Sequence, residues 1–293
     1  MKAYILLQIL FTLLISQASY AQNQNNAELQ KMADEDQKAR GSATIDWSVL
    51  NREDSIRREN VYAFYRENKV ITAQDYFNAG VVMQHGNDTV ASSLAVSSFK
   101  RALELDSNLN RWWYAAAVDR DLMRRNEPQI YGTQFIKTSA DGKWELYKMD
   151  ATKISDAERL YYKVGTYAEQ KEKERKMNLK SINQFFAQSN NIDETIQLIQ
   201  QEFKKQQAAD YSVDEADINN FGYQLMNNKK LEEALKIFKL NTELYPKGYN
   251  TFDSYGECLL ILGKKDEAKK AYEKSLVLNP ENNNAKKVLQ ELE

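Results

Sequence analysis

Four residues in the C-terminal part of the chain recur after 34 positions. A glycine is followed by an alanine, an aromatic residue and a proline at the same spacing each time: Gly222, Ala234, Phe238 and Pro246, then Gly256, Ala268, Tyr272 and Pro280. A repeat of this length is one supersecondary unit, which buries its apolar face only by stacking on a neighbour. The small Gly and Ala would let two antiparallel helices approach closely, the aromatic residue would fill the space between repeats, and Pro would end the second helix. The pattern therefore predicts two pairs of helices.

This spacing resembles the tetratricopeptide repeat, with Ile218 and Phe252 where Trp is usual. The resemblance implies two repeats and a polar capping helix within residues 215–293. Repeats of this family bind partner segments on the face made by the first helix of each pair. In this chain that face would carry the partner-binding candidates Asn219, Tyr223, Asn250, Asp253 and Glu257. The alternative is a structural array that packs only on the chain's own first domain.

A fragment of the same pattern lies in the N-terminal half. Ala95, Phe99 and Ala102 have the spacing of the second helix of a repeat, but Gly80 precedes Ala95 by 15 residues instead of 12. The match therefore requires a three-residue insertion near residues 87–89. Because about three repeats are usually needed for stability, two repeats alone would lean on the helices before them. The N-terminal half is either a degenerate repeat unit or a different helical domain.

The composition excludes several classes of function. Lys and Arg nearly balance Asp and Glu, with a formal net charge of −2, so the chain lacks the basic field of a nucleic-acid-binding protein. His85 and Cys258 are the only residues of their kinds, too few for a structural zinc site or an intramolecular disulfide. The sequence contains neither a phosphate-binding glycine loop nor a nucleophile motif. We therefore expect no metal and no cofactor.

The first 21 residues have the features of a secretory signal peptide. Lys2 supplies the positive charge, residues 3–15 are almost wholly apolar, and Ser19 and Ala21 are the small residues of a cleavage site. The apolar run is too short to span a membrane comfortably, although an uncut anchor is the alternative. The mature protein is thus expected in the periplasm or outside the cell. Residues 22–28 would form a disordered polar leader.

Apolar residues at helical spacing predict a helical domain over residues 29–180, with a small β-hairpin at the Asp141-Gly142 turn, and a connecting helix within 181–214. Polar motifs of the form DQxxR, QHG, DR and PQxYGTQ are embedded among the apolar residues of this domain. Together they resemble an uncharacterised bacterial domain family over about residues 30–175, which supplies no activity. The motifs contain these ligand-binding candidates: Asp36, Arg40, His85, Asp119, Arg120, Gln129, Tyr131 and Gln134.

Two roles are open for these residues. In an active or ligand site, His85 would transfer protons, charged by the negative end of its helix dipole, and Asp119 would orient it. Arg120 would clamp an anionic group, and Gln129 and Gln134 would donate to an oxyanion. Alternatively, all of them form one buried polar network that ties the hairpin to the helices. No recognised catalytic motif surrounds the catalytic candidates His85, Asp119 and Arg120, so they are weak candidates.

The sequence thus predicts a mostly α-helical protein, with an N-terminal helical domain followed by a tetratricopeptide-like array. The favoured function is that of an exported, non-enzymatic binding or scaffold protein, with a protein or peptide partner from the cell envelope docked on the repeats. The alternative is an enzyme or small-molecule sensor that uses the N-terminal polar residues.

Overall fold

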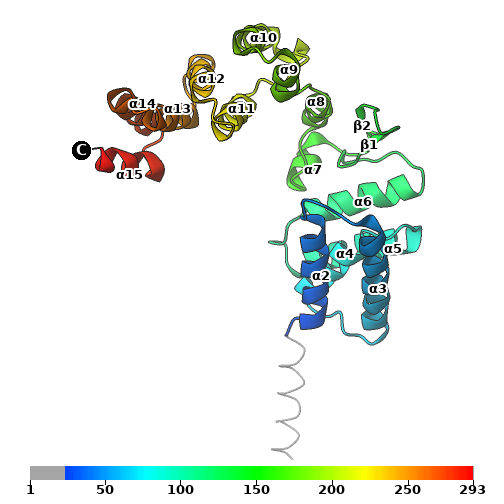
Figure 1. Cartoon of the computed structure of the whole chain (residues 1–293). Helices are drawn as coiled ribbons and strands as arrows, with labels where there is room; N and C mark the ends of the chain where they lie inside the picture. Colours follow the sequence, from blue (N-terminus) through cyan, green and yellow to red (C-terminus); the bar gives the residue numbers. More distant parts are fainter. Residues whose placement is uncertain (1–23, 293) are drawn as a thin grey trace, which may run out of the picture. The chain divides into compact units, whose positions relative to one another are not determined.

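The computed structural model describes residues 24–292, which divide into two compact units between residues 175 and 176 (Figure 1). This part of the chain contains fourteen α-helices, one short 3₁₀ helix and one two-stranded sheet. The predicted mostly α-helical fold with a small hairpin is therefore confirmed. The expected signal peptide lies outside the described residues. Among residues 24–292, no helix has the length and apolarity needed to cross a membrane.

Unit 1 starts with five helices: α2 (Ala27–Arg40), α3 (Trp47–Arg66), α4 (Ala73–Met83), α5 (Thr89–Leu105) and α6 (Trp112–Arg124). Each of the first four begins after a side chain that accepts hydrogen bonds from the free N–H groups of the first turn, namely Asn26, Asp46, Thr72 and Asp88. Because Asn26 caps α2, residues 27 and 28 are helical, although the sequence suggested a disordered leader up to residue 28.

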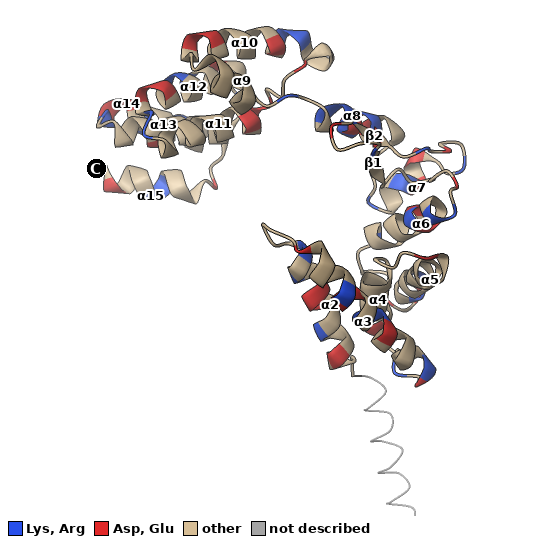
Figure 2. Cartoon of the chain, turned by 45° about the vertical axis from the view of Figure 1, so that its right-hand side comes forward, with Lys and Arg blue, Asp and Glu red and all other residues tan. Residues whose placement is uncertain are grey.

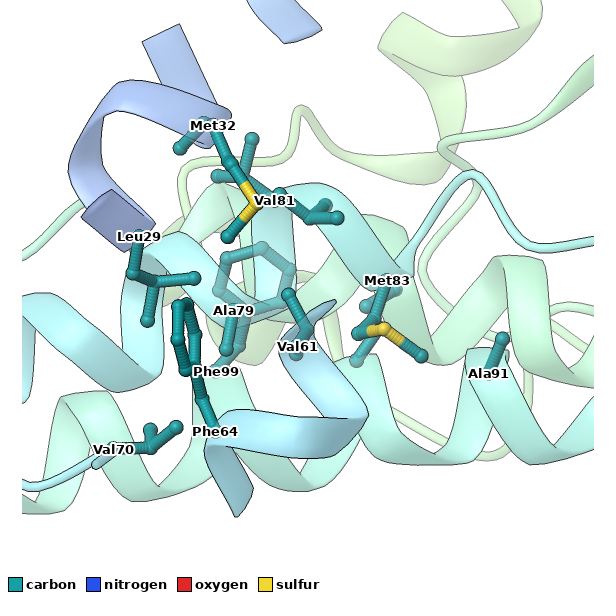
Figure 3. Packing of buried hydrophobic residues seen from close by; sticks show 14 residues of the cluster. Leu29, Met32, Val61, Phe64, Val70, Ala79, Val81, Met83, Ala91 and Phe99 are labelled. Carbon is teal, nitrogen blue, oxygen red and sulfur yellow. The ribbon is translucent and has the colours of Figure 1, made fainter. Parts of the chain in front are cut away.

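Helix α4 forms the centre of the core of unit 1, because it is buried along most of its length and contacts α2, α3 and α5. Figure 3 shows how side chains from these four helices pack together: Leu29 and Met32, Val61 and Phe64, Ala79, Val81 and Met83, and Ala91 and Phe99. Trp113 of α6 stacks on Phe99, with ring centroids 5.9 Å apart. This partly buried tryptophan therefore packs against the core.

Glycines beneath aromatic rings allow paired helices to approach closely in both units. A Cβ atom on Gly222 would lie 2.6 Å from Phe238, and one on Gly256 would lie 3.0 Å from Tyr272. Each aromatic residue therefore packs on the first helix of its own repeat, which corrects the expectation that it fills the space between repeats. Helices α4 and α5 pair in the same way, since a Cβ atom on Gly80 would lie 2.8 Å from Phe99.

The rest of unit 1 is a hairpin followed by two helices. Strand β1 (Phe135–Lys137) pairs antiparallel with β2 (Trp144–Leu146). The sequence predicts one helix from Ser155 to about Lys180, but the structure has α7 (Asp156–Tyr161) and α8 (Tyr167–Met177). Lys163 breaks the helix with a φ of 57°, and the Asp156 carboxylate accepts a hydrogen bond from the Tyr167 N–H across the turn at 2.9 Å.

Unit 2 is a stack of helical pairs: α9 (Ile182–Ser189) with α10 (Ile192–Lys205), α11 (Glu215–Asn227) with α12 (Leu231–Leu244), and α13 (Tyr249–Ile261) with α14 (Lys265–Leu278), closed by α15 (Asn283–Glu291). A 3₁₀ turn, η1 (Gln206–Ala208), follows α10. The sequence predicts only one helix before the repeats, whereas α9 and α10 form a third pair. Phe186 of α9 packs edge-on against Phe221 of α11 at 5.4 Å, so this pair covers the apolar end of the first repeat.

Candidate functional sites

Asp119 anchors the loop between α6 and β1. Its carboxylate is completely buried and accepts hydrogen bonds from the four backbone N–H groups of residues 130–133, and from the Thr133 hydroxyl, at 2.8–2.9 Å. The 130–133 loop therefore wraps around one carboxylate. All of these bonds serve the loop, so Asp119 does not orient His85, and the role proposed for it from the sequence is corrected.

The two glutamines of the PQxYGTQ motif also hold this loop. The Gln129 side chain is fully buried, donates to the carbonyls of Gln134 and Tyr147, and accepts from the Gln134 N–H, all at 2.8–2.9 Å. The Gln134 side chain donates to the Thr133 hydroxyl at 2.9 Å. Neither amide is free for an oxyanion. Their bonds join the loop to the hairpin, as the buried-network alternative requires.

Tyr131 and Arg159 complete the anchor, and the sequence gave no signal for Arg159. Tyr131 is buried and donates to Glu158 at 3.4 Å, and burial raises the pKa of its hydroxyl well above the usual range. Arg159 is only 2% exposed, donates to the Ile130 and Ala151 carbonyls, and pairs with Asp156 at 2.9 Å. An arginine in a short charged helix looks solvated in the sequence, which is why it escaped notice.

A second group of charged residues bridges α2 and α3. Arg40 pairs with Asp36 at 2.6 Å, as the i, i+4 spacing predicts, and also with Asp54 at 2.5 Å. Asp54 pairs with Arg57 at 2.7 Å. Burial alone would raise the pKa of Asp54, but the hydrogen bonds from Arg40 and Arg57 outweigh it and hold that pKa below its usual value. These ion pairs join the first two helices.

His85 and Arg120 lie beside this group. The His85 Nε2 atom is 3.4 Å from the Asp36 carboxylate, but it is buried and makes no hydrogen bond to the described residues. Burial lowers the pKa of His85 despite Asp36, so the expectation of a charged histidine at a helix end is corrected. Arg120 donates to the Gln84 side chain at 2.6 Å, and burial lowers the pKa of Arg120 to about 10.

The eight ligand-binding candidates therefore divide into two structural groups. Asp36, Arg40 and His85 lie together with Arg120 nearby, whereas the other four residues hold the 130–133 loop. The structure has a cleft of about 670 Å³ between α2 and α3, lined by Met32, Glu35, Lys38, Ala39, Ser42, Glu53, Ile56, Arg57 and Asn60. None of the eight candidates lines it. The hydrogen bonds and ion pairs of these candidates are thus made chiefly to other groups of the same domain.

The candidates in unit 2 share one surface, which we call the inner face: the side of α11 that faces α13, together with the side of α13 that carries Asn250, Asp253 and Glu257. Tyr223 links the two helices, because its hydroxyl donates to the Glu257 carboxylate at 2.7 Å and contacts the Ser254 hydroxyl at 3.1 Å. Burial, followed by the hydrogen bond to Glu257 and the charge of that carboxylate, raises the pKa of Tyr223 to about 12. This tyrosine is therefore a neutral hydrogen-bonding group at ordinary pH.

The remaining residues of the inner face differ in accessibility. Asp253 accepts hydrogen bonds from the side chains of Asn282 at 2.7 Å and Asn284 at 2.9 Å, which fixes its carboxylate. Asn250 is exposed one helical turn away. Asn219 precedes Tyr223 by four residues and is thus on the same side of α11. Its side-chain oxygen is buried but accepts no hydrogen bond from the described residues.

Metal and thiol chemistry receive no support from the described residues. Residues 24–292 contain no cluster of His, Cys, Asp and Glu that could hold a metal ion. Cys258 is buried in α13, and burial raises the pKa of its thiol to about 11. A thiol with that pKa is protonated near neutral pH and is a poor nucleophile. Cys258 therefore packs as a small apolar residue.

The comparisons with known proteins concern the repeats. The family model "Tetratricopeptide repeat" matches residues 251–282. One similar solved structure is the first TPR of Spaghetti (RPAP3) bound to HSP90 peptide SRMEEVD, with 27% identity, 42% of this chain and 90% of that chain covered, and a TM-score of 0.28. Another is YrrB, a TPR protein with an unusual peptide-binding site, with 16% identity, 80% and 99% coverage, and a TM-score of 0.28. No curated protein matches the chain. The residues that match the family model, 251–282, include most of α13 and all of α14, so the match falls on the second predicted repeat.

Proposed function

We propose that the chain is an exported, non-enzymatic binding or scaffold protein whose partner docks on the inner face. A protein or peptide partner suits a tetratricopeptide repeat, in which the first helices of neighbouring pairs form one extended surface. The partner would belong to the cell envelope, because the N-terminal 21 residues have the pattern of a signal peptide.

The buried side chain of Asn219 carries the proposal. Asn219 is only 6% exposed, and its unsatisfied oxygen lies on the side of α11 that also carries Tyr223. A buried acceptor without a donor costs about 1–3 kcal/mol. Because less than 1 Å² of this oxygen is accessible, a partner N–H group can reach it only when the Asn219 side chain rotates outward, and that rotation on binding would recover the free energy.

The competing function, an enzyme or small-molecule sensor, requires His85, Asp119 and Arg120 to converge on one opening. The five hydrogen bonds to the 130–133 loop and its Thr133 hydroxyl commit Asp119 to a structural role. No hydrogen bond or ion pair joins these three described side chains to one another. The structure therefore gives no observation that favours an enzyme or sensor over partner binding.

Co-purification of partners with a blocked inner face tests the proposal. Asn250→Arg adds a bulky cation to an exposed position of α13. Glu273→Arg, at an exposed position of α14, is the matched control on the second helix of the same repeat. We expect partners from an envelope extract to be lost with Asn250→Arg and retained with Glu273→Arg, while both variants melt like the wild type. Equal recovery with both variants would contradict the proposal.

A further inference from the structure

The helices of the inner face carry charge of one sign. Helices α11 and α13 contain four carboxylates and neither Lys nor Arg: Glu215, Asp217, Asp253 and Glu257. In contrast, α12 and α14 carry both signs, as the colours in Figure 2 indicate. Within residues 24–292, none of the four carboxylates forms an ion pair, although many other acidic residues of the chain do. Asp253 and Glu257, the two that the inner face carries, therefore leave it with uncompensated negative charge.

The two lysines of α15 do not supply the missing charge. On α15, Lys286 lies 3.8 Å from Glu281, and Lys287 lies 3.9 Å from Glu291. The side chains that do contact Asp253 are the neutral amides of Asn282 and Asn284. Tyr223 provides the contact to Glu257. These neutral donors hold both carboxylates in place without cancelling their charge.

The polar groups of the inner face are also mostly hydrogen-bond acceptors. The Tyr223 hydroxyl uses its proton on Glu257 and can then only accept. The oxygen of the buried Asn219 side chain has no donor. Burial is the main cause of the raised pKa of Tyr223, and Glu257 and Asp253 add to it, so both carboxylates lie close enough to act on this hydroxyl. A fitting partner must therefore bring N–H donors and positive charge.

We propose that the partner of the inner face is a cationic protein segment, extended and bearing Lys or Arg side chains, which pair with Asp253 and Glu257. An N–H group of the same segment would satisfy Asn219 when that side chain rotates outward on binding. This proposal rests on the proposed function, because it specifies the chemistry of the segment that docks there. Arg suits the site particularly well, since its planar fork can bridge two oxygens of a fixed carboxylate.

A peptide series tests the charge preference. The probes are three labelled peptides of equal length in which Ala alternates with Lys, Gln or Glu. Their affinities are measured by fluorescence anisotropy on the full chain, at low and at physiological ionic strength. We expect the Lys peptide to bind most tightly, and its advantage to shrink as salt screens the charges.

Two neutral variants assign the preference to the inner face. Asp253→Asn and Glu257→Gln keep the shape of each side chain and remove its charge. For partly exposed pairs we expect each change to weaken Lys-peptide binding about 2- to 5-fold, and the double variant to abolish the preference over the Gln peptide. Glu273→Gln on α14 is the matched control and should leave the preference unchanged.

The contradicting outcomes separate the two proposals. If the Gln or Glu peptide binds as tightly as the Lys peptide, or if no peptide binds, the cationic segment is wrong. A chain dimer dissociated by Asn250→Arg would also overturn it, because the occupant would then be a second copy. In each case the proposed function is still tested separately, by whether Asn250→Arg abolishes co-purification of a partner. If the Lys preference holds but survives the double variant, its origin lies elsewhere and the inference fails.

Discussion

The anchoring role of Asp119 makes a quantitative prediction. Asp119→Ala removes the acceptor of five hydrogen bonds, two of which come from the fully buried N–H groups of Tyr131 and Gly132. Each buried donor left without a partner costs about 1–3 kcal/mol, so these two alone cost about 2–6 kcal/mol. The other two N–H groups are partly accessible, and water can replace their partner. For a domain of about this size, that cost lowers Tm by about 5–20 °C.

Tryptophan fluorescence is a selective assay for this loss. All four tryptophans lie in unit 1, at positions 47, 112, 113 and 144, so their emission reports the unfolding of that unit alone. Asp141→Ala, at an exposed position of the hairpin turn, is the matched control and should melt like the wild type. If Asp119→Ala melts within about 2 °C of the wild type, the loop does not depend on this carboxylate. Asp119 would then be available for chemistry, and the structural interpretation would be refuted.

Three further predictions concern other parts of the chain. His85 is the only histidine, and its lowered pKa means that the unfolded state takes up a proton before the folded state does. The free energy of unfolding should therefore fall as pH drops below about 6.5. His85→Gln should remove that slope, and an unchanged slope would show that His85 is not its origin. Gly222→Ala should destabilise unit 2, because overpacking against Phe238 costs about 1–3 kcal/mol and exceeds the gain of roughly 1 kcal/mol in helix propensity. Shortening the ring with Phe238→Leu should relieve the loss, whereas independent, additive effects in circular dichroism melts would argue against the contact. Export predicts that the protein isolated from its own cells begins near position 22, and a Met1 terminus in the membrane fraction would indicate an uncut anchor.

The repeats could be predicted from the sequence because their determinants are local and periodic. Gly222 and Phe238 are separated by a fixed number of residues, and each repeat buries them in the same contact. Helix α9 escaped prediction because its eight residues form too short a pattern to separate from the helix that follows. The break between α7 and α8 does leave a trace that the prediction overlooked, since Gly165 disfavours a helix and Thr166 forms a capping box with Glu169.

The polar sites were predictable only in part. The sequence correctly identified Asp36 and Arg40 as a pair, because both lie on one helix. It missed Asp54 and Arg57, since charged residues on a long amphipathic helix usually face solvent. The partners of Asp119 are backbone N–H groups, which no residue type identifies. Burial decided the protonation of His85, and burial depends on the packing of several helices.

The most direct test of partner binding is site-specific photo-crosslinking in the cells that produce the protein. A photoreactive phenylalanine analogue would replace Asn250 on the inner face and, as the control, Glu273 on α14, both of which are exposed. The proposed function predicts a discrete crosslinked partner from position 250 and none from position 273. A partner captured equally at both positions, or only from position 273, would contradict docking on the inner face.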